Sequence, residues 1–208
     1  MFYRPGLDGH GLPRDPFKAL IAPRPIGWIS TVDASGRVNL APYSFFNAVS
    51  EKPPMVMYAT TGLKPGTEER KDTLANIRAT GEFVVNVVPL ALRDAMNRTS
   101  GAFPSDQDEF EFAGLGKAPS RIVAPPRVAE APAALECRVW KVVDLPSPST
   151  AMVIGEVVGI YIDDAILRDG LVDVTLYQPL ARLGYIHYAA VQEVFALRRP
   201  GSTEKNQP

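Results

Sequence analysis

The stretch RVNLAPYSFFNAVSEKPPMVMY, residues 37–58, decides how this chain folds. It has the composition of a β-strand, yet Pro42, Pro53 and Pro54 interrupt it, and each proline removes a backbone donor from strand pairing. Interrupted strands of this kind are typical of an edge, a bulge or a bend in a sheet. Because small polar and aromatic residues accompany the prolines, the stretch predicts a bent strand that exposes backbone groups to something other than a neighbouring strand.

Further strand-like runs surround this stretch. The expected strands are residues 24–32, 37–45, 54–60, 82–88, 133–145 and 151–163. The first two are joined by DASG, which is typical of a β-hairpin. Six or seven strands without βαβ alternation predict a mainly β fold, an antiparallel β-barrel with helical insertions.

Short helices are expected between the strands. Residues 71–81 predict one, with Asp72 as its N-cap and Gly81 at its end, and LALRDAMNRTSG predicts another. The acidic segment 104–112 is interpreted either as a lid over a site or as a solvated loop. Residues 1–195 form one expected domain, and residues 196–208 form an expected disordered tail.

Composition excludes several classes of function. The net charge is −1 with no basic block, which argues against nucleic acid, and no apolar run is long enough to span a membrane. The single cysteine, Cys137, excludes an intrachain disulfide and is expected to be a buried apolar residue. Because the start also lacks a hydrophobic region of the signal-peptide type, we expect a cytoplasmic protein.

The chemistry of the chain is expected to depend on a bound cofactor. Two histidines and one cysteine do not build a conventional zinc cluster, so no metal is predicted. No phosphate loop, no strand leading into GxGxxG and no nucleophile elbow is present. Of the two histidines, His187 is interpreted as a structural residue rather than a catalytic one.

The bent strand supplies the groups that a flat heterocycle needs. Its exposed N–H and C=O groups can bind the edge of a flavin or pyridine ring, while residues 39–50 provide polar contacts and aromatic cover. Trp28, Ser30 and Thr31 lie across the predicted hairpin. The alternative is that the aromatic residues form the barrel core and the prolines only mark an edge.

The stretch EERKDT, residues 68–73, provides a second candidate element. Arg70 and Lys71 lie beside the free amides at the start of the predicted helix, where Thr73 adds a hydroxyl group. This combination predicts an anion site, although a solvated charged turn remains the alternative. A strand that can bind the edge of a ring, together with a site that can bind a phosphate, indicates a mononucleotide cofactor.

The run RPIGWISTVDASGRVNLAPYSFFNAVSEKPP, followed by RKDTLANIRATGEFVVNVV, closely resembles the flavin reductase-like family of FMN-binding split-barrel, flavoredoxin-like proteins. The likeness continues in MVIGEVVGIYI and LARLGYIHY. It implies a six-stranded split β-barrel of the Greek-key type that forms a homodimer, with FMN near the subunit interface. The FMN-binding residues that it implies are Trp28, Ser30, Thr31, Asn39, Ala41, Pro42, Tyr43, Ser44, Asn47 and Ser50 around the ring and ribityl chain, and Arg70, Lys71 and Thr73 at the phosphate.

The resemblance implies an FMN-dependent oxidoreductase, an NAD(P)H:flavin reductase that passes hydride from NAD(P)H through FMN to a flavin or another small acceptor. Hydride moves directly between the two rings, so no catalytic residue is predicted. A monooxygenase is a further partner to which the reduced flavin can be supplied. The alternatives are an FMN-binding electron carrier and a non-catalytic FMN-binding protein. In one departure from the family pattern, Tyr185 stands where relatives often have a second glycine.

Overall fold

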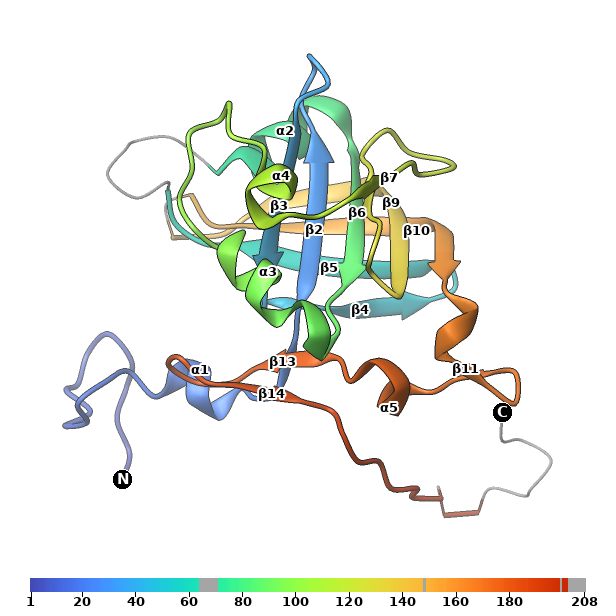
Figure 1. Cartoon of the computed structure of the whole chain (residues 1–208). Coiled ribbons are helices and arrows are strands. Elements are labelled where there is room, and N and C mark those ends of the chain that lie inside the picture. Colours follow the sequence, from blue (N-terminus) through green and yellow to red (C-terminus); the bar gives the residue numbers. More distant parts are fainter. Residues whose placement is uncertain (64–70, 148, 199, 202–208) are drawn as a thin grey trace.

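A computed structural model describes residues 1–63, 71–147, 149–198 and 200–201. Within these residues, the largest sheet has seven antiparallel strands in the order β3-β2-β6-β9-β10-β5-β4. The strands are β2 (Gly27–Val32), β3 (Val38–Tyr43), β4 (Phe46–Glu51), β5 (Pro54–Thr60), β6 (Glu82–Val87), β9 (Ala133–Asp144) and β10 (Ala151–Ile162). In Figure 1, β2 and β6 stand upright while β4 and β5 run across them, so the sheet coils into a barrel. The predicted mainly β barrel is confirmed.

The two edges of this sheet are neighbours in the chain. Strands β3 and β4 lie at opposite ends of the strand order, yet only Ser44 and Phe45 separate them. The carbonyl oxygen of Phe45 accepts a hydrogen bond of 2.8 Å from the amide of Ala59. Residues 44 and 45 therefore form a corner, and the predicted strand over residues 37–45 ends earlier, at Tyr43. Pro42, one of the interruptions noted in the sequence, lies just before this corner.

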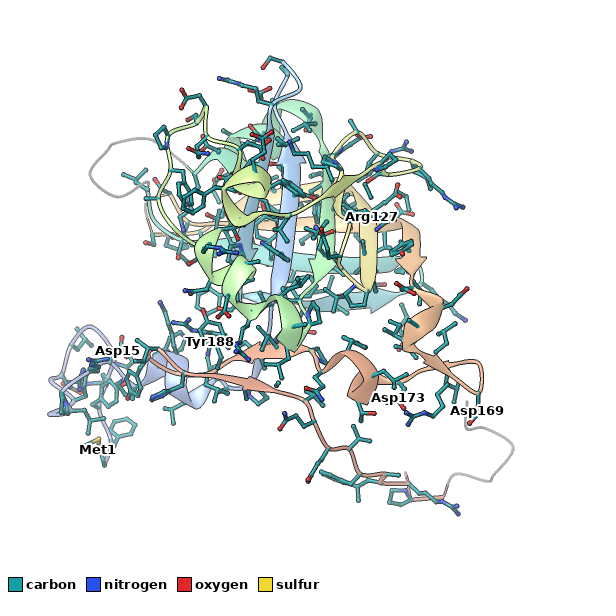
Figure 2. All side chains as sticks on the ribbon, in the orientation of Figure 1. Met1, Asp15, Arg127, Asp169, Asp173 and Tyr188 are labelled. Atoms are coloured by element: carbon teal, nitrogen blue, oxygen red, sulfur yellow. The ribbon has the colours of Figure 1, made fainter. Side chains whose placement is uncertain are left out.

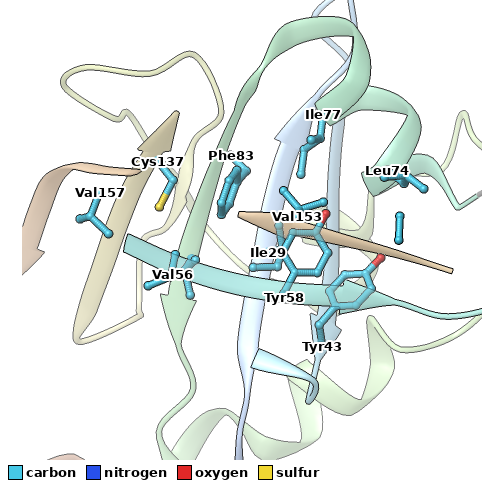
Figure 3. Close-up of a cluster of buried hydrophobic side chains, with 12 residues drawn as sticks. Ile29, Tyr43, Val56, Tyr58, Leu74, Ile77, Phe83, Cys137, Val153 and Val157 are labelled. Atoms are coloured by element: carbon cyan, nitrogen blue, oxygen red, sulfur yellow. The ribbon is translucent and has the colours of Figure 1, made fainter. Parts of the chain in front are cut away.

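An apolar core fills the space between the upright and the crossing strands. In Figure 3, Ile29 of β2 and Phe83 of β6 face Tyr58 of β5 and Val153 of β10. The ring centroids of Tyr43 and Tyr58 lie 4.7 Å apart. Cys137 is fully buried in the same core, and burial raises the pKa of its thiol, as expected for a structural cysteine. The barrel interior is thus closed to a ligand.

The helices of the described residues are short. They are α1 (Phe17–Leu20), α2 (Asp72–Thr80), η1 (Leu90–Leu92), α3 (Arg93–Arg98), α4 (Glu109–Ala113), η2 (Asp164–Ile166) and α5 (Val174–Tyr177). Gly81 ends α2 with a φ of 73°, as predicted. The prediction that Asp72 is the N-cap is wrong. Lys71 occupies that position, because the Asp72 carboxylate accepts a hydrogen bond from Ser105 instead of capping the helix.

Helix α4 corrects the interpretation of the acidic segment 104–112. Asp108 caps the helix, and its carboxylate accepts hydrogen bonds from the amides of Phe110 and Glu111. Phe110 is fully buried in a second apolar cluster with Trp28 and Met96. The second half of the segment is therefore not a solvated loop, because Phe110 ties it to the core, and the lid role stays a prediction.

A second layer lies below the barrel in Figure 1. It contains a small sheet in the order β1-β13-β14, with α1 and α5 beside it. Its strands are β1 (Arg24–Pro25), β13 (Leu180–Arg182) and β14 (Tyr188–Ala190), and the remaining short pairs are β7 (Lys117–Ala118) with β8 (Arg127–Val128) and β11 (Leu167–Arg168) with β12 (Leu171–Val172). Among the described residues, no helix has the length and apolar character that crossing a membrane requires. Most of the predicted tail, residues 196–208, lies outside the described residues.

Candidate functional site

A cavity of about 1220 Å³ lies between the barrel corner and the second layer. Pro42 at the end of β3 and Ser44 of the corner line one part of it, and Arg182 and Tyr188 of the β13–β14 hairpin line another. Its cationic side chains are Arg14, Lys18, Arg24, Lys71, Arg93 and Arg182, and its carboxylates are Asp15 and Asp94. Because the cations outnumber the carboxylates, the cavity favours an anionic ligand.

A smaller cavity of about 210 Å³ adjoins the large one. Both are lined by Pro42, Lys71 and Ser100, so they meet at the end of β3 and the start of α2. Asn39 and Thr73 also line the small cavity. The two cavities together offer a narrow polar pocket that opens into a wide basic one.

A buried hydrogen-bond network fixes the polar wall of the small cavity. The Glu109 carboxylate accepts hydrogen bonds from the Asn39 side-chain amide at 2.8 Å and from the backbone amide of Leu40 at 3.1 Å. The Thr73 hydroxyl donates to the Asn39 amide oxygen at 2.6 Å. Burial raises the pKa of Glu109, although its hydrogen bonds oppose that shift. Asn39 is therefore held in one orientation at the cavity wall.

Lys71 stands where the two cavities meet. It is half-buried, and its ammonium nitrogen lies 5.9 Å from the centroid of the Tyr43 ring. Burial lowers the pKa of Lys71, and the positive charge of Lys18 lowers it further. Burial and the charge of Lys18 both disfavour the ammonium form of Lys71. An anion bound between Lys71 and Lys18 would favour that form. The position is therefore one at which a negatively charged group would stabilise the ammonium form of Lys71.

The structure brings together some of the predicted FMN-binding residues. Those that line one or both cavities are Asn39, Ala41, Pro42, Tyr43, Ser44, Lys71 and Thr73. Arg70 lies outside the described residues. Asn47 and Ser50 belong to β4, at the other edge of the sheet, and Asn47 is exposed. The role predicted for these last three residues remains a prediction.

The three predicted residues of β2 are fully buried and do not line the cavities. The Trp28 indole nitrogen donates to the Thr99 hydroxyl at 2.9 Å, and the Ser30 hydroxyl donates to the Pro126 carbonyl at 2.6 Å. Thr31 accepts a hydrogen bond of 3.0 Å from the Asn76 side chain. Direct contact of these side chains with FMN stays a prediction, while their observed contacts support the strand behind the site.

Several residues of the site have no counterpart in the sequence prediction. Glu109 holds Asn39, and the only local signal for it is the helix that begins after Asp108. Ser100 follows α3 and borders both cavities. His187 is exposed at the hairpin turn and is not among the residues that line the large cavity.

Comparison with known proteins identifies the family. The model of the flavin reductase like domain matches residues 20–180. An uncharacterized protein of Aquifex aeolicus is 40% identical over 170 residues, which cover 81% of this chain and 85% of that protein. Nitrilotriacetate monooxygenase component B from Bacillus cereus has a TM-score of 0.85 at 30% identity, covering 95% of this chain and 98% of that one. The 2-nitrobenzoate 2-nitroreductase NbaA from Pseudomonas fluorescens has a TM-score of 0.79 at 32% identity, covering 92% of each chain. The chain therefore belongs to the flavin reductase-like family, as its resemblance predicted.

Proposed function

We propose that this protein is an FMN-dependent oxidoreductase, an NAD(P)H:flavin reductase that passes hydride through bound FMN to a flavin or another small acceptor. The observation that best supports this function is the pair of adjoining cavities at the barrel corner, one narrow and polar, the other wide and basic. Membership of the flavin reductase-like family supports a flavin as the cofactor. The proposal also includes a cytoplasmic location, supported by the single buried cysteine.

The residues present fit FMN. A phosphate group needs positive charge and hydrogen-bond donors, which are supplied by Lys71 and the first amides of α2. The Thr73 hydroxyl lines the same pocket and would have to turn away from Asn39 to donate to the phosphate. A ribityl chain needs polar partners, and Asn39 is held in place to provide one. A flat ring needs a wall, for which Pro42 and Ser44 of the corner are available. The large cavity exceeds the roughly 300–1,000 Å³ of ordinary ligand pockets, which leaves room for a second planar substrate.

The chain contributes binding and orientation rather than proton transfer. Bound FMN supplies the chemistry of hydride acceptance and donation. Lys71 anchors one end of the cofactor, while Glu109 fixes Asn39 so that this amide needs no reorientation on binding. The cations of the large cavity would attract the phosphates of a nicotinamide dinucleotide.

The proposal includes a homodimer. Trp140 on β9 is 63% exposed and Ile160 on β10 is 60% exposed. In the C-terminal segment, Phe195 and Leu197 are each 85% exposed. Large apolar side chains left in water mark surfaces that bind a partner, and a second copy of the chain is the simplest partner. The similarity to a monooxygenase component B supports, as a further part of the proposal, a monooxygenase that uses the reduced flavin.

The decisive experiment is an anaerobic absorbance measurement on the purified protein loaded with FMN. We expect the absorbance of oxidised flavin to bleach within seconds of adding NADH or NADPH, and to return when free FMN or oxygen is added. Free FMN with the same nicotinamides, without protein, is the control. Flavin that stays oxidised for many minutes with both nicotinamides would overturn the reductase in favour of an electron carrier. A protein that takes up no flavin would overturn both.

A further inference from the structure

Tyr185 has an unfavourable backbone conformation at the wall of the large cavity. It belongs to the turn between β13 and β14, and its φ is 57°. A residue with a Cβ rarely adopts this left-handed conformation, whereas glycine adopts it without strain. The turn is closed by hydrogen bonds of 3.0 Å from the Leu183 amide to the His187 carbonyl and from the His187 amide to the Gly184 carbonyl. A tyrosine therefore occupies a position where the backbone favours glycine.

The surrounding structure prevents the turn from relaxing. A Cβ atom on Gly184 would lie 2.4 Å from the Cβ of Ala19, so the turn is in close contact with α1. The buried guanidinium of Arg24 donates to the Leu183 carbonyl at 2.8 Å and also to the carbonyls of Lys18 and Ile21. The left-handed backbone of Tyr185 is therefore held by contacts with α1 and Arg24. Backbone strain that neighbouring contacts maintain at a cavity wall indicates a function for the side chain.

Tyr185 is one of two tyrosines that meet guanidinium groups at this wall. Tyr185 is 40% exposed and lines the large cavity, and the guanidinium carbon of Arg14 lies 6.0 Å from the centroid of its ring. The Arg182 guanidinium lies 4.3 Å from the ring centroid of Tyr188, its partner across the β13–β14 pair. Tyr188 lies between this hairpin and the barrel (Figure 2). We call Arg14, Arg182, Tyr185 and Tyr188 the rim.

The two tyrosine rings and two guanidinium groups of the rim suit a ligand that has both a planar base and phosphates. Aromatic faces stack on bases, and arginine binds phosphate oxygens through two parallel hydrogen bonds. Tyr185 and Tyr188 line the large cavity and not the small one, whereas Thr73 lines only the small one. The rim is thus distinct from the seat assigned to the FMN phosphate, and it is available to a second ligand.

We infer that the rim binds the adenosine diphosphate half of the nicotinamide substrate, with adenine stacked on Tyr185 and the diphosphate held by Arg14 and Arg182. This inference rests on the proposed function, because it assigns the second substrate of the same site. Tyr185 then determines affinity for the dinucleotide rather than for the flavin.

Calorimetric titration with ADP-ribose tests the inference, because ADP-ribose has the diphosphate and adenine but no ring that donates hydride. We expect Tyr185→Gly to bind ADP-ribose at least about fivefold more weakly than the wild type, the lower limit for loss of one base–aromatic stack. Tyr185→Phe keeps the ring and should match the wild type. Both variants should bind FMN normally. Because glycine suits the φ of 57°, Tyr185→Gly is expected to fold with an unchanged or higher melting temperature.

Arginine variants provide a matched control. Arg14→Ala is expected to weaken ADP-ribose binding at least about fivefold, as loss of a charge-assisted contact predicts. Arg127→Ala is the control, because it also removes a contact between a guanidinium and a tyrosine ring. The guanidinium carbon of Arg127 lies 3.6 Å from the centroid of the Tyr161 ring. Arg127 does not line the large cavity and lies higher on the barrel (Figure 2), so its loss should leave ADP-ribose affinity unchanged.

The outcomes separate this inference from the proposed function. A wild type that is reduced by NADH or NADPH but binds no ADP-ribose would overturn the inference alone. Equal losses of FMN and ADP-ribose affinity in Tyr185→Gly would also overturn it, by assigning the ring to the flavin. A protein that shows the expected ADP-ribose pattern but is reduced by neither nicotinamide would overturn the reductase and leave the rim as a nucleotide site.

Discussion

Lys71 shows how much of the proposed site depends on one charge. The proposed anion site at the meeting point of the cavities contains this ammonium group, and Lys18 lies close enough to lower the pKa of Lys71. A bound phosphate would offset both effects, because its negative charge attracts the two ammonium groups, although Lys71 stays half-buried. The two ligands FMN and riboflavin differ only in that phosphate.

We expect Lys71→Ala to weaken FMN binding about tenfold or more, since a hydrogen bond to a charged group contributes about 1.5–3 kcal/mol. Riboflavin affinity should be unchanged. Flavin fluorescence titrations measure both, and Lys52→Ala, which removes an equal charge from the exposed turn before β5, is the control. Equal losses for the two flavins would contradict a phosphate role for Lys71. Arg70 lies outside the described residues, so the single Lys71 variant gives the cleaner test.

Glu109 links the site to pH. Because burial raises its pKa, the folded protein holds this proton more tightly than the unfolded chain does. The stabilisation from protonation is complete below the unfolded pKa, about 4.3, and is lost as the pH rises through the higher folded pKa. Glu109→Gln does not titrate, so the free energy of unfolding of the wild type minus that of the variant should fall as the pH rises. Urea denaturation across about pH 4 to 8 measures this difference, and a difference that is constant or rises with pH would contradict the shift.

At the scale of elements, the turn between β13 and β14 packs closely against helix α1. Gly184 permits their contact, since a Cβ there would lie 2.4 Å from the Cβ of Ala19 and 2.7 Å from its Cα. Both elements line the large cavity, through Lys18 and Tyr185. Separating them should therefore open the cavity.

We expect Gly184→Ala to displace α1 and to cost about 1–3 kcal/mol, as overpacking usually does. Limited trypsin digestion measures the displacement, because cleavage after Lys18 should become faster. Gly9→Ala is the matched control in the same N-terminal segment, since a Cβ there meets no atom within 4 Å. Equal cleavage rates for both variants would show that the turn adjusts without moving the helix.

Strands with a strong hydrophobic pattern could be predicted from the sequence. Strands and site residues whose positions depend on tertiary contacts could not. Long strands such as β9 and β10 have enough apolar residues to be recognised. Strand β4 was not separated from its neighbours, because most of its side chains are exposed and lack alternation. Both faces of β2 are buried, so alternation alone does not reveal which of its residues border a site.

The site was predictable only where its residues are close in the chain. Pro42, Ser44 and Lys71 lie within stretches with recognisable composition, and all three line the large cavity. Glu109 contacts Asn39 across 70 positions of sequence, and no local pattern reports such a contact. The strain at Tyr185 depends in the same way on contacts between distant segments.

At the scale of the whole molecule, the exposed apolar surface predicts the oligomeric state. We expect light scattering at micromolar concentration to give twice the chain mass of 22.6 kDa. The double variant Phe195→Asp, Leu197→Asp should shift the mass toward the monomer, because it places charges in a segment that the single chain leaves uncovered. Phe2→Asp, at an N-terminal side chain that is 90% exposed, is the control. A wild-type mass of 22.6 kDa would reject the dimer.

The corner at Ser44 and Phe45 also bears on newly made chains that have not yet bound a cofactor. Here the two open edges of the sheet are held near each other, and unpaired edges are templates on which other chains aggregate. A ligand bound against Pro42 and Ser44 favours the closed corner, and its stabilising effect grows by about 1.4 kcal/mol for each tenfold rise in its free concentration. If the protein binds FMN as proposed, we expect solubility during overproduction to follow the availability of flavin.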